Sequence, residues 1–293
     1  IPPPDPDTHL NLTGLGHLPD EPAVRREIDG ALALEPMFRW VREIYPDTPW
    51  VYYLSQQRFM CVYPFIPFDG FFMDAVSQSK RPIWLRRGWG MDKASELDAA
   101  AIEMMQRAKA VMGADRLLIY NGFRARAAAV DGSAAAGAEF LPHAHGAMIE
   151  HFDGLSSTSK EDMLLYWQMA AEAARAGKIV VFKCWPDHDI NWLNKEFMAR
   201  SAKEKEAIAR RRITYPLACF LVGAQENSYF CYGWGYDIHD GQLIEYPEYR
   251  RKLGPPKGGA VRQPGTWVFR REFEHASVWV DLDKQEGSVE WKP

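Results

Sequence analysis

The chain has 293 residues, of which 47% are apolar and 25% charged, values that argue against disordered, collagen-like and coiled-coil proteins. Its length predicts one large or two modest domains. The 35 Lys and Arg residues against 39 Asp and Glu give a net charge of -4, which argues against a nucleic-acid partner because no overall positive field would hold a phosphate backbone.

Several other classes of protein are disfavoured by short patterns. No uncharged apolar run approaches the roughly 18–20 residues of a membrane span, and the first residues lack the features of a signal peptide. Serine hydrolases, nucleotide-binding proteins and dinucleotide-dependent enzymes are disfavoured because their glycine-containing motifs are missing, so no cofactor is predicted. The four cysteines lack zinc-site spacing and are predicted to be free: Cys61, Cys184, Cys219 and Cys231.

The N-terminal quarter predicts an α+β segment. Residues 1–22 are rich in Pro, Gly and Asp and predict an extended arm. Apolar residues recur at helical spacing over 23–44, where Pro36 kinks or restarts the helix. The runs 50–54 and 59–63 flank a four-residue loop, which is typical of a β-hairpin.

From Phe68 onward the sequence alternates between short apolar strands and amphipathic helices, which predicts a parallel sheet with βαβ connections. The predicted strands are 71–76, 117–120, 146–149, 179–183 and 217–222. The predicted helices are 95–112, closed by Gly113; a helix opened by Thr158 and Glu161 and ended by Gly177; and 194–212. The aromatic segment 228–236 is expected to be irregular or strand-like.

After Gly254 the sequence first becomes rich in Pro and Gly and then alternates apolar with charged residues, which predicts a small antiparallel β-module. The predicted domains are therefore an N-terminal α+β segment over 1–66, an α/β portion over 67–253 and the β-module over 254–293.

Ligands of parallel α/β proteins bind at the carboxyl ends of the strands, where the loops are free to carry function. The predicted strands end there in acidic residues, and two carboxylates across a cleft can cleave a glycosidic bond. We predict that Asp74 and Glu150 form this catalytic pair. The alternative is that such acidic residues cap helices or face solvent.

The residues that follow the other strands, together with nearby histidine and tryptophan side chains, are predicted to bind substrate. They are Asn121, His143, His145, Trp185, Asp187, Glu226 and Trp234. An indole face can stack on a sugar ring. The alternatives for the histidines are a zinc cluster and loop histidines whose hydrogen bonds are made within the protein. The alternatives for Asp187 are a helix cap and a metal ligand. No metal site is predicted, because the spacing of metal ligands is missing.

The strings FDGFFMDAV, LLIYNGF, GAMIEHF, KIVVFKCW and LACFLVGAQENSYFCYGWG, with the tail from EYRRKLGPP to SVWVDL, resemble the later strands and C-terminal β-module of glycoside-hydrolase-like TIM-barrel families. The resemblance covers residues 68–293. It implies a partial (β/α)8-type barrel and a carbohydrate substrate. It also implies that Asp74 is the nucleophile and Glu150 the acid/base.

The strings NLTGLGHL, EIDGALALEPMFRWVREIYPDT and PWVYYLSQQRFMCVYPF, over residues 10–66, resemble the opening of an extracytoplasmic Cache-type sensor domain with a PAS-like sheet. This resemblance implies a periplasmic or secreted location. It also supplies a second functional hypothesis, a small-molecule sensor or binding module. A carbohydrate-binding protein without catalysis is a third.

A closed barrel of this type needs eight strands, and five are predicted after Phe68. An open parallel sheet leaves its edges unpaired. We therefore expect one of three outcomes: the N-terminal helix and hairpin cover the gap, two chains associate as a homo-oligomer, or the half-barrel has low stability.

Overall fold

The computed structural model describes residues 70–74, 76, 96, 99–110, 112–129, 134–150, 152, 159–186, 196, 199–233 and 245–292. The predicted N-terminal arm, helix, hairpin and Cache-like segment lie outside these residues. The chain divides into two compact units, the first comprising Ile1–Ile119 and Pro142–His145 and the second Tyr120–Leu141 and Gly146–Pro293. The predicted domain boundaries at residues 66 and 253 stay predictions.

In the first unit, strand β1 (Gly70–Met73) is shorter than predicted and ends before Asp74. A helix covers residues 99–110, and the chain then turns at Gly113, as predicted. Gly113 has a φ of 89° and its N–H donates to the Lys109 carbonyl at 3.2 Å. Glycine takes this left-handed conformation without a steric penalty, which is why it ends the helix.

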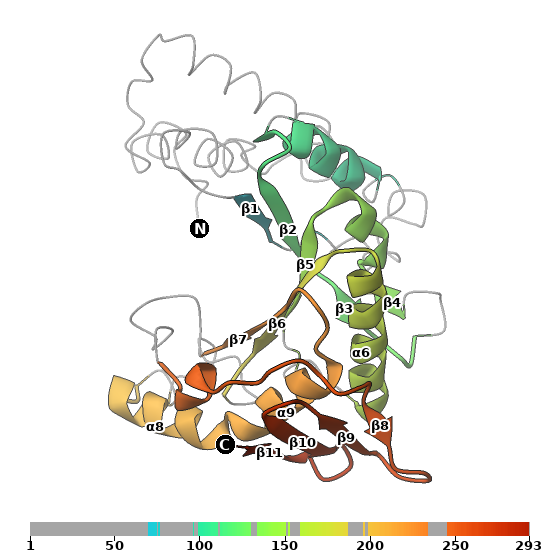
Figure 1. The fold of residues 1–293 in the computed structure, drawn as a ribbon. Helices are drawn as coiled ribbons and strands as arrows, with labels where there is room; N and C mark the ends of the chain where they lie inside the picture. Colours follow the sequence, from blue (N-terminus) through green and yellow to red (C-terminus); the bar gives the residue numbers. More distant parts are fainter. Residues whose placement is uncertain are drawn as a thin grey trace. The chain divides into compact units, whose positions relative to one another are not determined.

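The main sheet has five strands in the order β1-β2-β5-β6-β7 (Figure 1). The strands after β1 are β2 (Leu117–Asn121), β5 (Gly146–Glu150), β6 (Ile179–Cys184) and β7 (Ser228–Tyr232). Neighbours β5 and β6, and β6 and β7, run parallel. The predicted parallel α/β class is confirmed. The partial (β/α)8-type barrel remains a prediction.

The fifth strand is not the predicted one. The run Leu217–Val222 lies within helix α9 (Thr214–Gly223), and β7 supplies the strand instead. All residues of α9 from Pro216 to Gly223 are buried. The Phe220 ring packs against Phe182 of β6 on one side, and α9 contacts the C-terminal sheet on the other. A helix covered on two sides has no polar face, so its sequence is an unbroken apolar run like that of a buried strand.

Among the described helices between the later strands, α6 and α8 begin later than predicted. Helix α6 (Lys160–Arg175) has the capping box Ser159 and Asp162, one residue beyond the predicted pair. Helix α8 (Ala202–Arg212) begins after a second capping box, Ser201 and Glu204, rather than at residue 194. In each box the serine side chain accepts a hydrogen bond from the backbone N–H of the third helical residue, and the acidic side chain accepts one from the serine N–H. Two backbone N–H groups at the start of the helix therefore have partners nearby in the sequence.

The C-terminal β-module is confirmed as an antiparallel sheet with strand order β11-β10-β9-β8. Its strands are β8 (Val261–Arg262), β9 (Val268–Glu272), β10 (Ala276–Asp281) and β11 (Glu286–Trp291). Helix α9 lies against this sheet (Figure 1). The alternating burial of β10 turns Val278 and Val280 inward, as the sequence pattern predicts.

The remaining short elements are the paired strands β3 (Arg124–Ala125) and β4 (Ala135–Ala136) and the 3-10 helices η2 (Ala138–His143) and η5 (Pro247–Arg250). In the part of the chain that the structure describes, no helix is long and apolar enough to cross a membrane.

Candidate functional site

A row of polar side chains crosses the carboxyl edge of the sheet in the second unit. Glu150, the last residue of β5, pairs in register with Lys183 of β6, and Lys183 pairs with Cys231 of β7. Residues in register on parallel strands point to the same face of a sheet. The row therefore presents a carboxylate, an ammonium and a thiol on one face.

Glu150 is half-buried, and a hydrogen bond holds its side chain. The Asn121 amide Nδ2 donates to Glu150 Oε2 at 2.7 Å. Asn121 is the last residue of β2 and only 6% exposed, so its amide comes from a rigid strand end. Both residues are among those predicted from the sequence, and the structure brings them together.

Arg124 of β3 lies close enough to Glu150 to interact with it electrostatically. Burial lowers the pKa of the Arg124 guanidinium, while attraction to Tyr166 and to Glu150 opposes that change. The Arg124 Nε atom is buried and has no hydrogen-bond partner among the described residues. Arg124 is not among the predicted site residues, because it lies outside the predicted strands.

Lys183 is the most deeply buried charged residue of this edge, at 1% exposure. Its Nζ donates to the Gly233 carbonyl at 2.6 Å and the Cys184 carbonyl at 3.2 Å, and lies 4.2 Å from the centre of the Trp185 ring. Carbonyl oxygens and an indole face replace part of the hydration that the ammonium loses. Lys183 is not among the predicted site residues, although a single charged residue inside the apolar strand Ile179–Cys184 is a detectable signal.

Trp185 is not the open stacking surface expected from the sequence. Its side chain is only 3% exposed, and one face of the indole is covered by Lys183. The indole therefore stabilises the ammonium, and the face that Lys183 covers is closed to a sugar ring.

The two histidines predicted to bind substrate belong to the first unit, whereas Glu150 belongs to the second. His145 directly precedes β5, and Glu150 is the last of its five residues, so about 16 Å of extended chain separates them. His145 Nδ1 accepts the Leu118 N–H at 2.9 Å, and the His145 N–H donates to the Leu118 carbonyl at 2.8 Å. His143 is within hydrogen-bond distance of Gln106, 3.2 Å. These contacts favour the alternative of satisfied loop histidines.

Glu226 is also misplaced by the sequence analysis. It precedes β7 and is exposed, so it lies at the amino end of that strand and not at the carboxyl end. The error follows from taking α9 for a strand. Asp187 and Trp234 lie outside the described residues. Among the described residues, no group of His, Cys, Asp and Glu could hold a metal ion.

Asp74 is exposed in the turn after β1, in the first unit, whereas Glu150 belongs to the second. Its pairing with Glu150 stays a prediction.

The fold and these contacts define an α/β protein with a carboxylate-centred candidate site at the carboxyl edge of its parallel sheet. Residues 65–277 match the sequence model described as hypothetical glycosyl hydrolase family 15, and the chain therefore belongs to this family. The match confirms the predicted glycoside-hydrolase-like segment. The matched region begins at residue 65, and the match does not cover the Cache-like segment before it. No curated protein matches the chain.

Proposed function

We propose that the protein hydrolyses a glycosidic bond, with Glu150 as one of its two catalytic carboxylates and Asp74 as the other. The observation that carries the proposal is the hydrogen bond that fixes Glu150 at the carboxyl edge of the sheet in a member of a glycosyl hydrolase family. Glycoside cleavage needs a carboxyl group held in place beside the bond that breaks.

Glu150 acts in this proposal as the acid that protonates the leaving oxygen. Its carboxylate then remains beside the Asn121 amide and within the field of Arg124. A hydrogen-bond donor and a nearby cation both stabilise the carboxylate that is left once the proton has moved to the leaving oxygen. Asp74 attacks the anomeric carbon or activates the water that does so.

The test uses the full chain with a panel of 4-nitrophenyl glycosides and polysaccharides. We expect Glu150→Gln and Asp74→Asn each to lower kcat by about 10²–10⁴-fold on the substrate that the wild type cleaves. The matched control is Glu172→Gln, the same chemical change at an exposed position of α6, which should leave kcat unchanged.

Full activity in both carboxylate variants would show that the assignment is wrong. Saccharide binding by the wild type without turnover would favour the non-catalytic alternative instead. If activity is found, the separation of the two carboxyl groups in a substrate complex distinguishes the mechanisms. A separation of about 5–5.5 Å indicates retention, and about 6.5–9.5 Å indicates inversion.

A further inference from the structure

A cavity of about 620 Å³ lies within the second unit, where the end of β6, the junction of α8 and α9, and the β10–β11 hairpin meet. This volume is in the range of small-molecule binding sites, roughly 300–1,000 Å³. A smaller hollow of about 310 Å³ shares Tyr215 and Gln285 with the cavity as lining residues. The two hollows are therefore adjacent parts of one groove, which we call the hairpin groove. Glu150 lines neither part.

The wall of the larger cavity has an excess of positive charge. Arg211 and Arg212 come from the last turn of α8, both exposed, and Glu286 is the acidic residue of the lining. Arg212 Nη1 donates to the Pro186 carbonyl at 3.3 Å, which fixes one guanidinium against the cavity wall. Guanidinium groups bind carboxylates through paired, charge-assisted hydrogen bonds.

Flat aromatic side chains form the other part of the wall. Trp279 of β10 and Tyr215 of α9 line the cavity, and both are half-buried. Gln285 and Thr214 add neutral hydrogen-bonding groups beside them. Aromatic faces next to amide, hydroxyl and guanidinium groups suit a ligand that has both apolar faces and many hydroxyls, and an oligosaccharide has this character.

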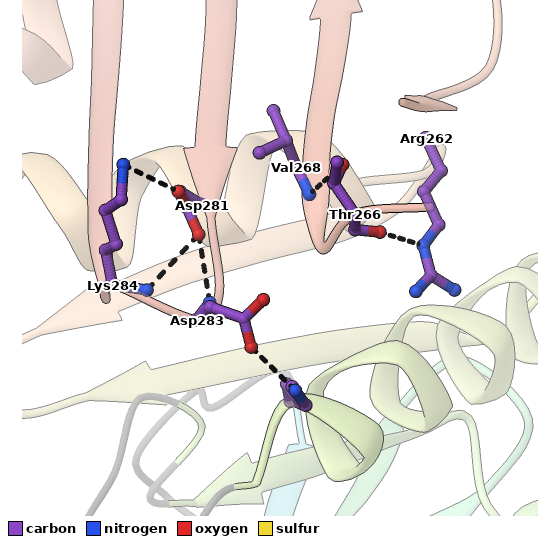
Figure 2. A network of polar contacts seen from close by, with 7 residues as sticks. Arg262, Thr266, Val268, Asp281, Asp283 and Lys284 are labelled. Carbon is purple, nitrogen blue, oxygen red and sulfur yellow. Dashed lines mark hydrogen bonds and ion pairs between the residues drawn. The ribbon is translucent and has the colours of Figure 1, made fainter. Parts of the chain in front are cut away.

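The turn that carries Gln285 is held by a network of polar contacts (Figure 2). The Asp281 carboxylate accepts the N–H groups of Asp283 at 3.0 Å and Lys284 at 3.2 Å, and the Lys284 ammonium lies 3.5 Å from it. Lys160 of α6 donates to Asp283 at 2.6 Å. Gln285 is the next residue of this turn and has a φ of 56°, a left-handed conformation. The groove wall is thus ordered before a ligand arrives, which lowers the entropy cost of binding.

We propose that the hairpin groove binds an oligosaccharide that carries a carboxylate, such as a uronic acid, with the carboxylate at Arg211 and a sugar ring on Trp279. The inference goes beyond the proposed function, because it requires no bond cleavage and does not involve Glu150.

The experiment is a calorimetric titration of the full chain with tri-galacturonate and, separately, with the neutral trisaccharide cellotriose. We expect the uronate to bind more tightly, and Arg211→Ala to weaken its binding by about tenfold or more. Arg251→Ala, an exposed arginine away from the groove, is the matched control and should bind like the wild type. Trp279→Ala should weaken both saccharides, and Trp279→Phe should restore part of the affinity.

Three outcomes would overturn the proposal. They are no binding of either saccharide, equal loss of affinity in Arg211→Ala and Arg251→Ala, and competition by sulfate or acetate at the concentration that tri-galacturonate needs, which would indicate a simple anion site. Glu150→Gln separates this proposal from the proposed function, because it should bind tri-galacturonate like the wild type. Binding of tri-galacturonate without hydrolysis of any glycoside would support the groove proposal and contradict the proposed function.

Discussion

Burying the Lys183 ammonium costs more free energy than burying any other described residue of the candidate site, because the group loses nearly all of its hydration. Its compensation comes from two backbone carbonyls and the indole of Trp185. The Gly233 carbonyl, at 2.6 Å, is contributed by the residue after β7, so the side chain ties the end of β6 to the end of β7. We infer that Lys183 holds the carboxyl edge of the sheet in shape beside Glu150.

Replacing Lys183 with Met should lower the free energy of unfolding by about 1–3 kcal/mol, because the Gly233 and Cys184 carbonyls lose a donor inside the protein. Urea denaturation of the full chain measures this change. Lys252→Met, the same replacement at an exposed position, is the control and should change the free energy by less than about 0.5 kcal/mol. Equal stability of the two variants would show that the buried ammonium does not support this edge.

At the level of single residues, the sequence predicts site residues where a polar residue ends an apolar strand. Asn121 and Glu150 are two such residues, and the structure joins them by a hydrogen bond. Their roles stay predictions. The closeness of His145 to Glu150 in the sequence does not show at which end of the five-residue strand β5 a side chain lies. Arg124 was missed because its electrostatic interaction with Glu150 depends on the tertiary structure and not on a local sequence pattern.

Helix α9 is stabilised by hydrogen bonds from the β-module that covers it. Arg271 of β9 is 6% exposed, and its Nη1 donates to three carbonyls near the C-terminal end of α9: Leu221 at 3.0 Å, Val222 at 3.1 Å and Ala224 at 2.5 Å. The last carbonyls of a helix have no partner within the helix, and they carry the negative end of its dipole. One guanidinium from the antiparallel sheet satisfies them, which couples the module to the helix behind the parallel sheet.

Arg271→Met should therefore reduce the free energy of unfolding by about 2–3 kcal/mol, since charge-assisted hydrogen bonds to buried carbonyls are lost. Arg270→Met changes the neighbouring exposed arginine of the same strand and should have little effect. Urea denaturation followed by tryptophan fluorescence provides the comparison. Similar unfolding midpoints for both variants would argue against coupling through Arg271.

At the level of elements, strands and helices with one solvent-facing side could be predicted, and α9 could not. Helix α6 was recognised by its period and its glycine end, with an error of one residue in the cap. The β-module was recognised by alternation. In α9 the apolar residues run without a break because both sides are covered, and the choice between helix and strand depended on tertiary packing that no local pattern contains.

At the scale of the whole molecule, the second unit contains several buried tyrosines that must stay neutral. Burial raises the pKa of Tyr166 from 10.0 to about 12, with attraction to Arg124 opposing the change. Burial also raises the pKa of Tyr120 and Tyr246 above their ordinary value. The folded state therefore holds these phenolic protons more tightly than the unfolded state does.

This difference predicts how stability depends on pH. Because the folded pKa of Tyr166 is the higher one, its contribution is fully present below pH 10 and is lost as the pH rises to about 12. The loss for this residue is roughly 2–3 kcal/mol. Tyr166→Phe should accordingly lose less stability than the wild type between pH 10 and 12, as measured by urea denaturation at pH 8, 10 and 11. Parallel losses in both proteins would contradict the assignment to Tyr166.

The overall architecture was predictable because the parallel sheet and the antiparallel module differ in their apolar patterns. Continuous apolar strands such as β5 are typical of a parallel sheet covered on both faces, and alternating ones such as β10 of an antiparallel sheet covered on one. Sheet closure could not be predicted, because it depends on strand pairs that are distant in the sequence.

Insertions and deletions in the turn between α9 and β7 are constrained by the register of β7 against β6. Loss of one residue there would shift β7 by one position and turn each of its side chains to the opposite face. An aromatic ring would then replace Cys231 beside Lys183, and Phe230 would lose its position 5.2 Å from the Phe220 ring. Insertions or deletions at this turn during evolution are therefore expected to involve two residues at a time, because such changes leave each β7 side chain on the same face of the sheet.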